Sequence, residues 1–166
     1  MDKTKSIDEL AAWLGDREGL LSWKLDGLTI VLTYEGGRLE KAVTRGNGVI
    51  GEVVTPNAKV FENLPLSIPF KGRLTVRGEA FIKYSDFERI NKTIDDVEAK
   101  YKNPRNLCSG SVRQLNNEIT AQRNVNFAAF SLTEATKEDG SEMDFDNSRE
   151  NQMKFLSPRA LRLWNM

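Results

Sequence analysis

The sequence predicts an α+β domain that has a mixed, largely antiparallel sheet and flanking helices. Residues 28–44 have the pattern of a β-hairpin, and further strands are expected at 73–82 and 125–132. Two patterns of the type Ser-x-x-Glu, which cap helix N-termini, accompany these strands. The strands and helices do not alternate regularly, which argues against a doubly wound parallel sheet.

A short leading helix is expected within residues 1–15. Ser6 and Glu9 have the spacing of a capping box, and Gly15 is a natural stop. Between them, apolar residues recur on one helical face: Ile7, Leu10, Ala11 and Leu14.

The hairpin follows this helix. Residues 28–34 alternate so that four side chains share one face of a strand: Leu28, Ile30, Leu32 and Tyr34. Glu35-Gly36-Gly37 then turns the chain, and residues 38–44 return as the second strand. A glycine-rich loop comes next, at residues 45–51.

The later elements are marked by caps and charge. Ser85 and Glu88 form the second capping box, and a further helix is expected within residues 103–115. Residues 132–150 carry seven carboxylates against Lys137 and Arg149 and are expected to form an exposed loop, and a last helix begins near Ser148. Five aromatic residues are expected in the core because they fall on apolar faces: Trp13, Trp23, Phe87, Phe127 and Phe130.

Composition excludes several classes of chemistry. The 166 residues carry 24 basic and 24 acidic side chains, no histidine and one cysteine, Cys108. Without histidine there is no imidazole base, no Ser-His-Asp or Cys-His nucleophile system and no His-bearing zinc site. One cysteine forms no internal disulfide, and no apolar run has membrane-spanning length. We therefore expect a cytoplasmic protein with no membrane partner, whose oligomeric state the sequence leaves open.

Lys24-Leu25-Asp26-Gly27 stands directly before the first strand of the hairpin. A deprotonated lysine amine attacks phosphorus or carbonyl centres, and no histidine competes with Lys24 for that role. Taken alone, the segment is better explained as a lysine at a strand edge followed by an Asp-Gly turn.

Five further segments follow Lys24 in order. They are Thr44-Arg45-Gly46-Asn47-Gly48, Val76-Arg77-Gly78-Glu79, Asn103-Pro104-Arg105-Asn106, Gly110-Ser111-Val112-Arg113-Gln114-Leu115 and Ile119-Thr120-Ala121-Gln122-Arg123. Together with the Lys24 segment, this series closely resembles the adenylation domain of bacterial NAD-dependent DNA ligases, over residues 6–156.

The resemblance implies an ATP-grasp-like DNA ligase nucleotidyltransferase fold and a reaction. AMP passes from NAD to the amine of Lys24, then to the 5' phosphate of nicked double-stranded DNA, and attack by the 3' hydroxyl seals the nick. Arg45 and Glu79 would bind the nucleotide, since a guanidinium suits a phosphate and a carboxylate accepts from ribose hydroxyls. Magnesium would neutralise phosphate charge. We assign no side chain as a metal ligand.

Three arginines match family positions that face the DNA backbone: Arg105, Arg113 and Arg123. Residues 101–131 hold these three and Lys102 against Glu118 alone, a local charge of +3. A basic surface of this kind suits phosphate contacts, which position DNA without reading its sequence.

The sequence departs from the family pattern at three positions. Ser22 stands where many members have a glutamate that contacts adenine, so Ser22 is assigned to the cofactor site on the strength of its hydroxyl. Asn47 and Val53 stand where acidic residues are common. These differences suggest a divergent branch of the family.

The resemblance also suggests a partial domain. The helical domain that precedes this one in the family, and the two lysines that follow it, have no counterpart here. We expect a nucleotidyltransferase core at 16–157 and an atypical tail at 158–166, which a frameshift would explain, and an isolated chain that does not complete the reaction.

Two alternatives stay open. One is a non-catalytic nucleotide- or DNA-binding remnant, and the other is an ATP-using nucleotidyltransferase of the RNA ligase or capping enzyme type. The segments between residues 103 and 123 favour the NAD-dependent family over the second of these.

Overall fold

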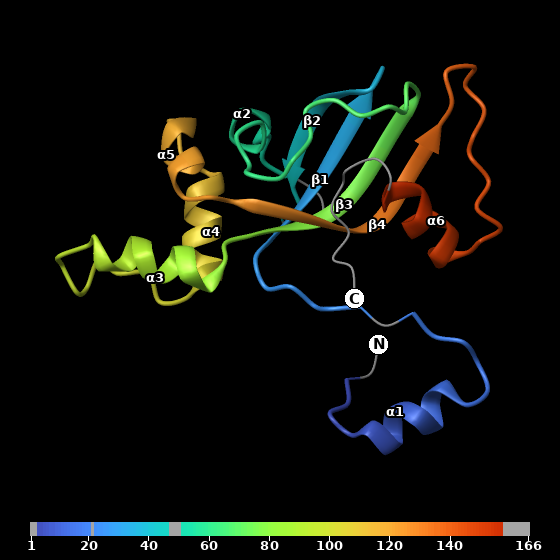
Figure 1. Cartoon of the computed structure of the whole chain (residues 1–166), viewed down its shortest axis with the longest axis horizontal. Helices are drawn as coiled ribbons and strands as arrows, with labels where there is room; N and C mark the ends of the chain where they lie inside the picture. The colour runs from blue at the N-terminus through green and yellow to red at the C-terminus, as the bar shows by residue number, and fades with distance from the viewer. Residues whose placement is uncertain (1–2, 21, 47–50, 158–166) are drawn as a thin grey trace.

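The computed structural model describes residues 3–20, 22–46 and 51–157. Its centre is a four-stranded antiparallel sheet in the order β2-β1-β3-β4 (Figure 1). The expectations about Asn47, Gly48 and the tail at 158–166 lie outside the described residues. The described part is therefore an α+β structure, as the sequence predicted.

The first two strands form the predicted hairpin. β1 (Leu28–Glu35) pairs with β2 (Arg38–Thr44) across a turn in which Gly36 and Gly37 both have positive φ. Such φ values are unfavourable for residues with a Cβ, so the two glycines allow this tight reversal. The predicted inward face is confirmed, because Ile30, Leu32 and Tyr34 are fully buried.

The other two strands complete the sheet. β3 (Arg73–Phe81) lies between β1 and β4 (Asn126–Thr136) and is antiparallel to both. β4 is longer than predicted, and its last residues fall in the stretch that was expected to be a loop. The acidic residues suggested an exposed loop, but an acidic side chain can be accommodated in this strand. The carboxylate of Glu134 accepts a hydrogen bond from the Thr75 hydroxyl of β3 at 3.1 Å.

The described part of the chain contains six helices, five of which flank the sheet (Figure 1). The predicted cap at Ser6 is confirmed, and the helices that begin at Pro104 and Arg149 are capped in the same way: the side chains of Ser6, Asn103 and Ser148 each accept a backbone N–H of the first turn. The helices are α1 (Ile7–Leu14), α2 (Thr55–Ala58), α3 (Tyr84–Lys92), α4 (Pro104–Val112), α5 (Asn117–Gln122) and α6 (Arg149–Leu156).

The predicted cap at Ser85 is wrong. α3 begins one residue earlier, and its N-cap is Lys83, which makes no capping side-chain bond. The N–H of Phe87 already donates to the carbonyl of Lys83, so Ser85 lies inside the first turn. The carboxylate of Asp86 fixes this turn instead, because it accepts from Arg89 and from Asn124 of a distant segment.

Side chains from the helices close the core on the sheet. Leu107 and Val112 of α4 and Leu156 of α6 are fully buried. Beside α6, the Phe155 ring meets the rings of Phe70 and Phe145 edge-on, at centroid distances of 5.4 and 5.2 Å. Edge-to-face packing of this kind fixes α6 near β4.

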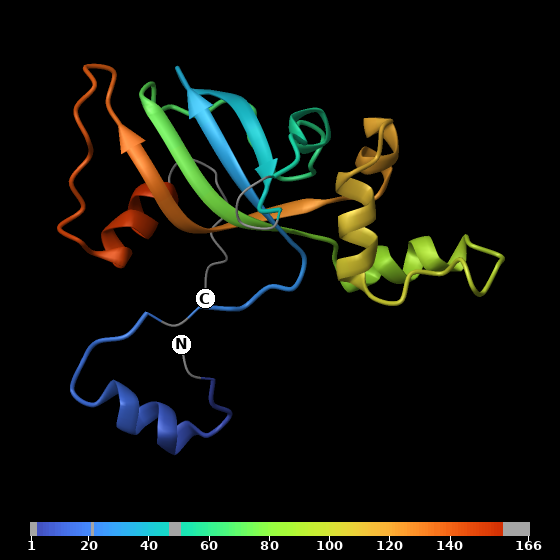
Figure 2. The ribbon, with the colours of Figure 1, turned by 180° about the vertical axis from the view of Figure 1, so that it is seen from behind.

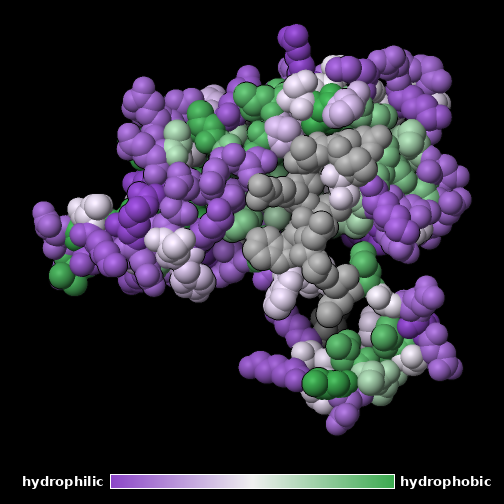
Figure 3. All heavy atoms as spheres, in the orientation of Figure 1, coloured by the Kyte–Doolittle hydropathy of each residue, from purple (hydrophilic) through white to green (hydrophobic). Residues whose placement is uncertain are grey.

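The leading helix α1 stands apart from the sheet in both views of the ribbon (Figures 1 and 2). None of its residues is buried, and its apolar side chains lie on the surface (Figure 3).

The predicted core positions of Trp13, Trp23 and Phe130 are wrong, because these side chains are 66%, 70% and 45% exposed. Helical periodicity identifies an apolar face, but it does not supply the element that covers it. Phe127, which is 2% exposed, and Phe87, which packs against the core, are where the sequence placed them.

In the part of the chain that the structure describes, no helix combines the length and the apolar character needed to cross a membrane.

Candidate functional site

The lysine segment, Lys24–Gly27, runs into the start of β1 without regular secondary structure. Lys24 and Ser22 are both exposed. Gly27 is buried against β3, where an added Cβ would lie 1.9 Å from the carbonyl oxygen of Ala80. Glycine is required here because any side chain would push the segment away from the sheet.

Glu79, near the end of β3, holds this segment from the sheet side. Its Oε1 accepts the Gly27 N–H at 3.0 Å, and its Oε2 accepts the Thr29 hydroxyl at 2.9 Å. Thr29 pairs with Glu79 in the sheet, and on its other side the Arg45 N–H donates to the Thr29 carbonyl at 3.0 Å. Two residues that the sequence assigned to the nucleotide, Arg45 and Glu79, therefore flank one residue of β1.

Arg105 reaches the same segment from α4. Its Nη1 lies 2.8 Å from Oδ1 of Asp26, in an ion pair between residues 79 positions apart. Arg105 is in the first turn of α4, directly after Pro104 and the N-cap Asn103. This arginine, assigned to DNA by resemblance, here contacts the lysine segment.

The other two arginines have different surroundings. Arg113, at the C-terminal end of α4, forms an ion pair with Glu52, and both side chains are exposed. Arg123 is half-buried: its guanidinium lies 5.4 Å from the centroid of the Tyr101 ring and donates to the Ser111 hydroxyl at 3.1 Å. The structure thus places Arg113 on the surface and Arg123 within the packing of α5 against α4.

Cys108 lies beneath the site. It is fully buried, and this burial, together with the negative charge of Glu79, raises the pKa of its thiol to about 12. The neutral thiol is therefore the form present at physiological pH. Cys108 is therefore a packing residue.

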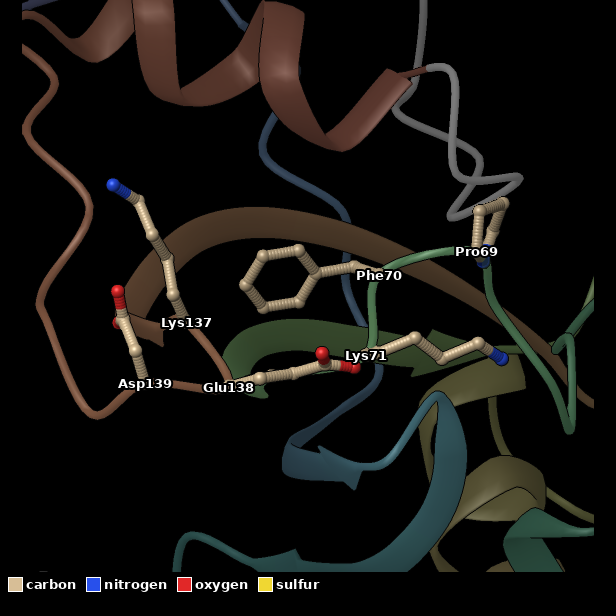
Figure 4. A pocket seen from close by; sticks show the side chains of 7 residues that line it. Pro69, Phe70, Lys71, Lys137, Glu138 and Asp139 are labelled. Atoms are coloured by element: carbon tan, nitrogen blue, oxygen red, sulfur yellow. The ribbon is translucent and has the colours of Figure 1, made fainter.

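An open hollow of about 570 Å³ lies at the other end of the sheet (Figure 4). Its walls come from the segment before β3 and from the turn after β4. They consist of Pro69, Phe70, Lys71, Gly72, Lys137, Glu138 and Asp139. None of the predicted site residues is among them. The described residues also contain no group of three or more His, Cys, Asp or Glu side chains that could hold a metal ion.

Sequence reasoning did not find the partners within the site. Asp26 was part of the lysine segment, but nothing in the sequence linked it to Arg105. Thr29 lay within the predicted hairpin strand, and the sequence did not single out Glu52. One signal was available for Glu79 and Thr29, because both lie near the predicted strand ends that must meet in an antiparallel sheet.

The fold and the site together define an α+β domain in which an exposed lysine precedes a central strand, with a glutamate on one neighbouring strand and an arginine directly after the other. Residues 6–163 match the NAD-dependent DNA ligase adenylation domain. The chain belongs to this family.

The curated relatives agree with this assignment. The chain is 72% identical over 132 residues to the DNA ligase of Lachnoclostridium phytofermentans, a match that covers 80% of this chain and 20% of the relative. It is 61% identical over 156 residues to the DNA ligase of Ruminiclostridium cellulolyticum, covering 94% of this chain and 23% of the relative. The DNA ligase of Sulfurimonas denitrificans is 46% identical over 112 residues, which cover 67% of this chain and 17% of the relative. The chain thus spans about a fifth of the length of the relatives it matches.

Proposed function

We propose that this chain carries the lysine and nucleotide site of an NAD-dependent DNA ligase, with Lys24 as the residue that becomes adenylated. The observation that supports this best is the lysine segment itself, which Glu79 and Arg105 hold from two sides while Lys24 stays exposed. An exposed amine on a held segment can approach a bound phosphate.

The proposed reaction has three transfers. The neutral amine of Lys24 attacks the α-phosphorus of the AMP moiety of NAD and loses one proton to water as the P–N bond forms. The bond to the bridging oxygen breaks, and nicotinamide mononucleotide leaves with that electron pair. A 5' phosphate oxygen of the nick then attacks the same phosphorus, the P–N bond breaks, and the lysine nitrogen leaves as an amine after taking up a proton from water. Finally the 3' hydroxyl attacks the 5' phosphate, loses its proton and releases AMP.

Three residues are proposed to bind the nucleotide. Glu79 uses each oxygen for one hydrogen bond within the protein, and a carboxylate has about four acceptor positions, so it can still accept from ribose hydroxyls. Arg45, on the opposite side of Thr29, supplies a guanidinium for phosphate. Ser22 lies two residues before Lys24 and offers a hydroxyl to the base.

Magnesium is proposed as the accompanying metal, supplying charge neutralisation at the phosphates. In the described ranges no three-ligand cluster exists, and the exposed carboxylate of Asp26 stands closest in sequence to Lys24. Mg²⁺ commonly takes most of its oxygen ligands from phosphates and water, with one or two carboxylates. A single carboxylate such as Asp26 beside the phosphates of the nucleotide is compatible with this coordination.

The finer fold assignment and the domain limits belong to the same proposal. We take residues 16–157 as part of an ATP-grasp-like nucleotidyltransferase core, with residues 1–15 as a leading helix. Nicked double-stranded DNA is the proposed partner, with Arg105, Arg113 and Arg123 on the side that faces it, and the cytoplasm is the proposed location.

The test uses a chimera, because the chain spans about a fifth of its relatives. This chain replaces the 156-residue segment that it matches in the Ruminiclostridium cellulolyticum DNA ligase. After incubation with NAD and magnesium, mass spectrometry should detect one added AMP, which Lys24→Ala abolishes and Lys137→Ala, at the other end of the sheet, leaves in place.

A folded chimera without the AMP adduct would overturn the proposal and favour a non-catalytic nucleotide- or DNA-binding role. An adduct that survives Lys24→Ala would move the nucleophile to another residue. Adduct formation from ATP but not NAD would favour the ATP-using alternative.

A further inference from the structure

We infer that Arg105 is a positioning residue for Lys24, which it acts on through its ion pair with Asp26 before any DNA is bound. The inference rests on the proposed function of Lys24, and it gives Arg105 a task separate from DNA contact. The relevant geometry is the 2.8 Å contact between Arg105 Nη1 and Asp26 Oδ1.

The two partners of this ion pair differ in how firmly they are held. Arg105 belongs to α4, which is anchored by Leu107, Cys108, Ser111 and Val112, all fully buried. Asp26 belongs to a segment without regular secondary structure. The ion pair therefore transfers the fixed position of α4 to the lysine segment.

The placement of Arg105 on α4 also needs a compensating charge. Arg105 lies in the first turn of the helix, and that turn contains no acidic residue. The positive end of the helix dipole disfavours a cation at this position. The carboxylate of Asp26 offsets this unfavourable interaction, because its negative charge lies beside the guanidinium of Arg105.

Two adjacent residues of the segment are tied in different directions. Asp26 is bound to α4 through Arg105, and the Gly27 N–H is bound to β3 through Glu79 at 3.0 Å. Lys24 lies two residues before the first tie. A segment tied only at Gly27 would keep its link to the sheet but could rotate about it, and Lys24 would sample more orientations.

The ion pair contributes little to global stability, because its side chains are 57% and 70% exposed. Its effect is expected in the local order of residues 22–27 and in the lysine adenylation step. If Arg105 only contacted DNA, its substitution would change neither the local order of residues 22–27 nor the adenylation step when DNA is absent.

The first experiment measures amide hydrogen exchange of the 166-residue chain, and it needs no catalytic activity. Arg105→Ala and Asp26→Asn are each expected to speed exchange in residues 22–27 by about threefold to tenfold, since loss of a tie increases local opening. The double variant should show no more than either single change, and Arg105→Lys should restore most of the protection. Arg73→Ala, which removes an exposed arginine paired with Glu35 and Glu134, is the matched control.

Unchanged exchange in Arg105→Ala would overturn the inference, as would additive effects in the double variant, because two residues that act through one bond cannot add.

The second experiment measures lysine adenylation by the chimera without DNA. Arg105→Ala should lower its rate constant by about tenfold while the KM for NAD stays within about twofold, because orientation rather than NAD binding is lost. A normal DNA-free rate combined with impaired nick sealing would assign Arg105 to DNA alone and overturn the inference. If the chimera forms no adduct at all, the proposed function fails, and hydrogen exchange still decides whether Arg105 positions the segment.

Discussion

At each end of the sheet, a glycine directly before a strand lies against a carbonyl of the neighbouring strand. A Cβ on Gly27 would lie 1.9 Å from the oxygen of Ala80, and a Cβ on Gly72 would lie 1.9 Å from the oxygen of Thr136. Each end also has a glutamate that accepts from a threonine of the adjacent strand: Glu79 from Thr29, and Glu134 from Thr75.

The two ends differ in the parts of the chain that these glycines, glutamates and nearby arginines hold in place. At the Gly72 end, Arg73 pairs with Glu35 and Glu134, so the charges link neighbouring strands. At the Gly27 end, Glu79 and Arg105 hold an irregular segment that carries an exposed lysine. Similar hydrogen bonds and ion pairs link strands at one end and hold the segment of the proposed nucleophile, Lys24, at the other. If the proposal for Lys24 is right, substitutions at the Gly27 end affect activity and substitutions at the Gly72 end do not.

The largest difference is expected between two lysines. Lys24→Ala in the chimera should lower AMP transfer by about 1,000-fold or more, because removing a nucleophile removes the covalent step. Lys137→Ala, at the Gly72 end, should stay within about twofold. The measurement is the rate of AMP adduct formation with NAD, and equal losses in the two variants would remove the distinction between the ends.

Substitution of the two glycines should lower the stability of the chain equally but should change the rate of AMP transfer unequally. Gly27→Ala and Gly72→Ala should each lower the free energy of unfolding of the 166-residue chain by about 3 kcal/mol, since a Cβ has no space at either position. Urea denaturation measures this. In the folded chimera only Gly27→Ala should slow AMP transfer, and a slow Gly72→Ala enzyme would show that strain spreads through the sheet.

The two glutamates give a smaller contrast. Glu79→Ala should cost about 1–3 kcal/mol of stability, because the N–H of the buried Gly27 loses its acceptor. Glu134→Ala should cost about 1 kcal/mol or less, since its arginine partner is exposed. Thermal unfolding separates the two values, and a matching loss of nucleotide affinity in Glu134→Ala would contradict the assignment of the ribose contact.

The smallest expected effects concern the arginines proposed to face DNA. Arg113→Ala should weaken nicked-DNA binding by the chimera severalfold and lower the slope of log affinity against log salt by about 1. Arg123→Ala should act more through stability, by about 1 kcal/mol, because the guanidinium bonds Ser111 and stacks on Tyr101. Arg73→Ala should leave DNA affinity unchanged. Titrations at several salt concentrations would expose an equal slope change in Arg73→Ala, which would assign the effect to net charge.

The parts of the fold that sequence could predict depend on residues close together in the chain. The hairpin, its buried face, the cap at Ser6 and the helices expected within 103–115 and near Ser148 each follow from patterns a few residues long. The failures arise where distant segments decide. Ser85 had the capping spacing, but Asp86 bonds to Asn124, 38 residues away, and β4 extends through an acidic stretch because β3 lies beside it.

The candidate site shows the same limit. The sequence pattern brought Lys24, Arg45 and Glu79 into one hypothesis, and their proximity to the start of β1 supports it. It could not separate Arg105, Arg113 and Arg123, which match the family alike. Their different partners, Asp26, Glu52 and Ser111, come from tertiary packing.

The buried position of Cys108 makes the chain convenient for site-specific labelling. It is the single cysteine of the sequence, and it is fully enclosed beneath Glu79. A cysteine introduced in place of the fully exposed Leu115 would then be the one thiol open to a maleimide dye in the native protein. Because Leu115 lies two residues from Arg113, such a fluorophore would test the proposed approach of DNA to Arg113 without removal of the native cysteine.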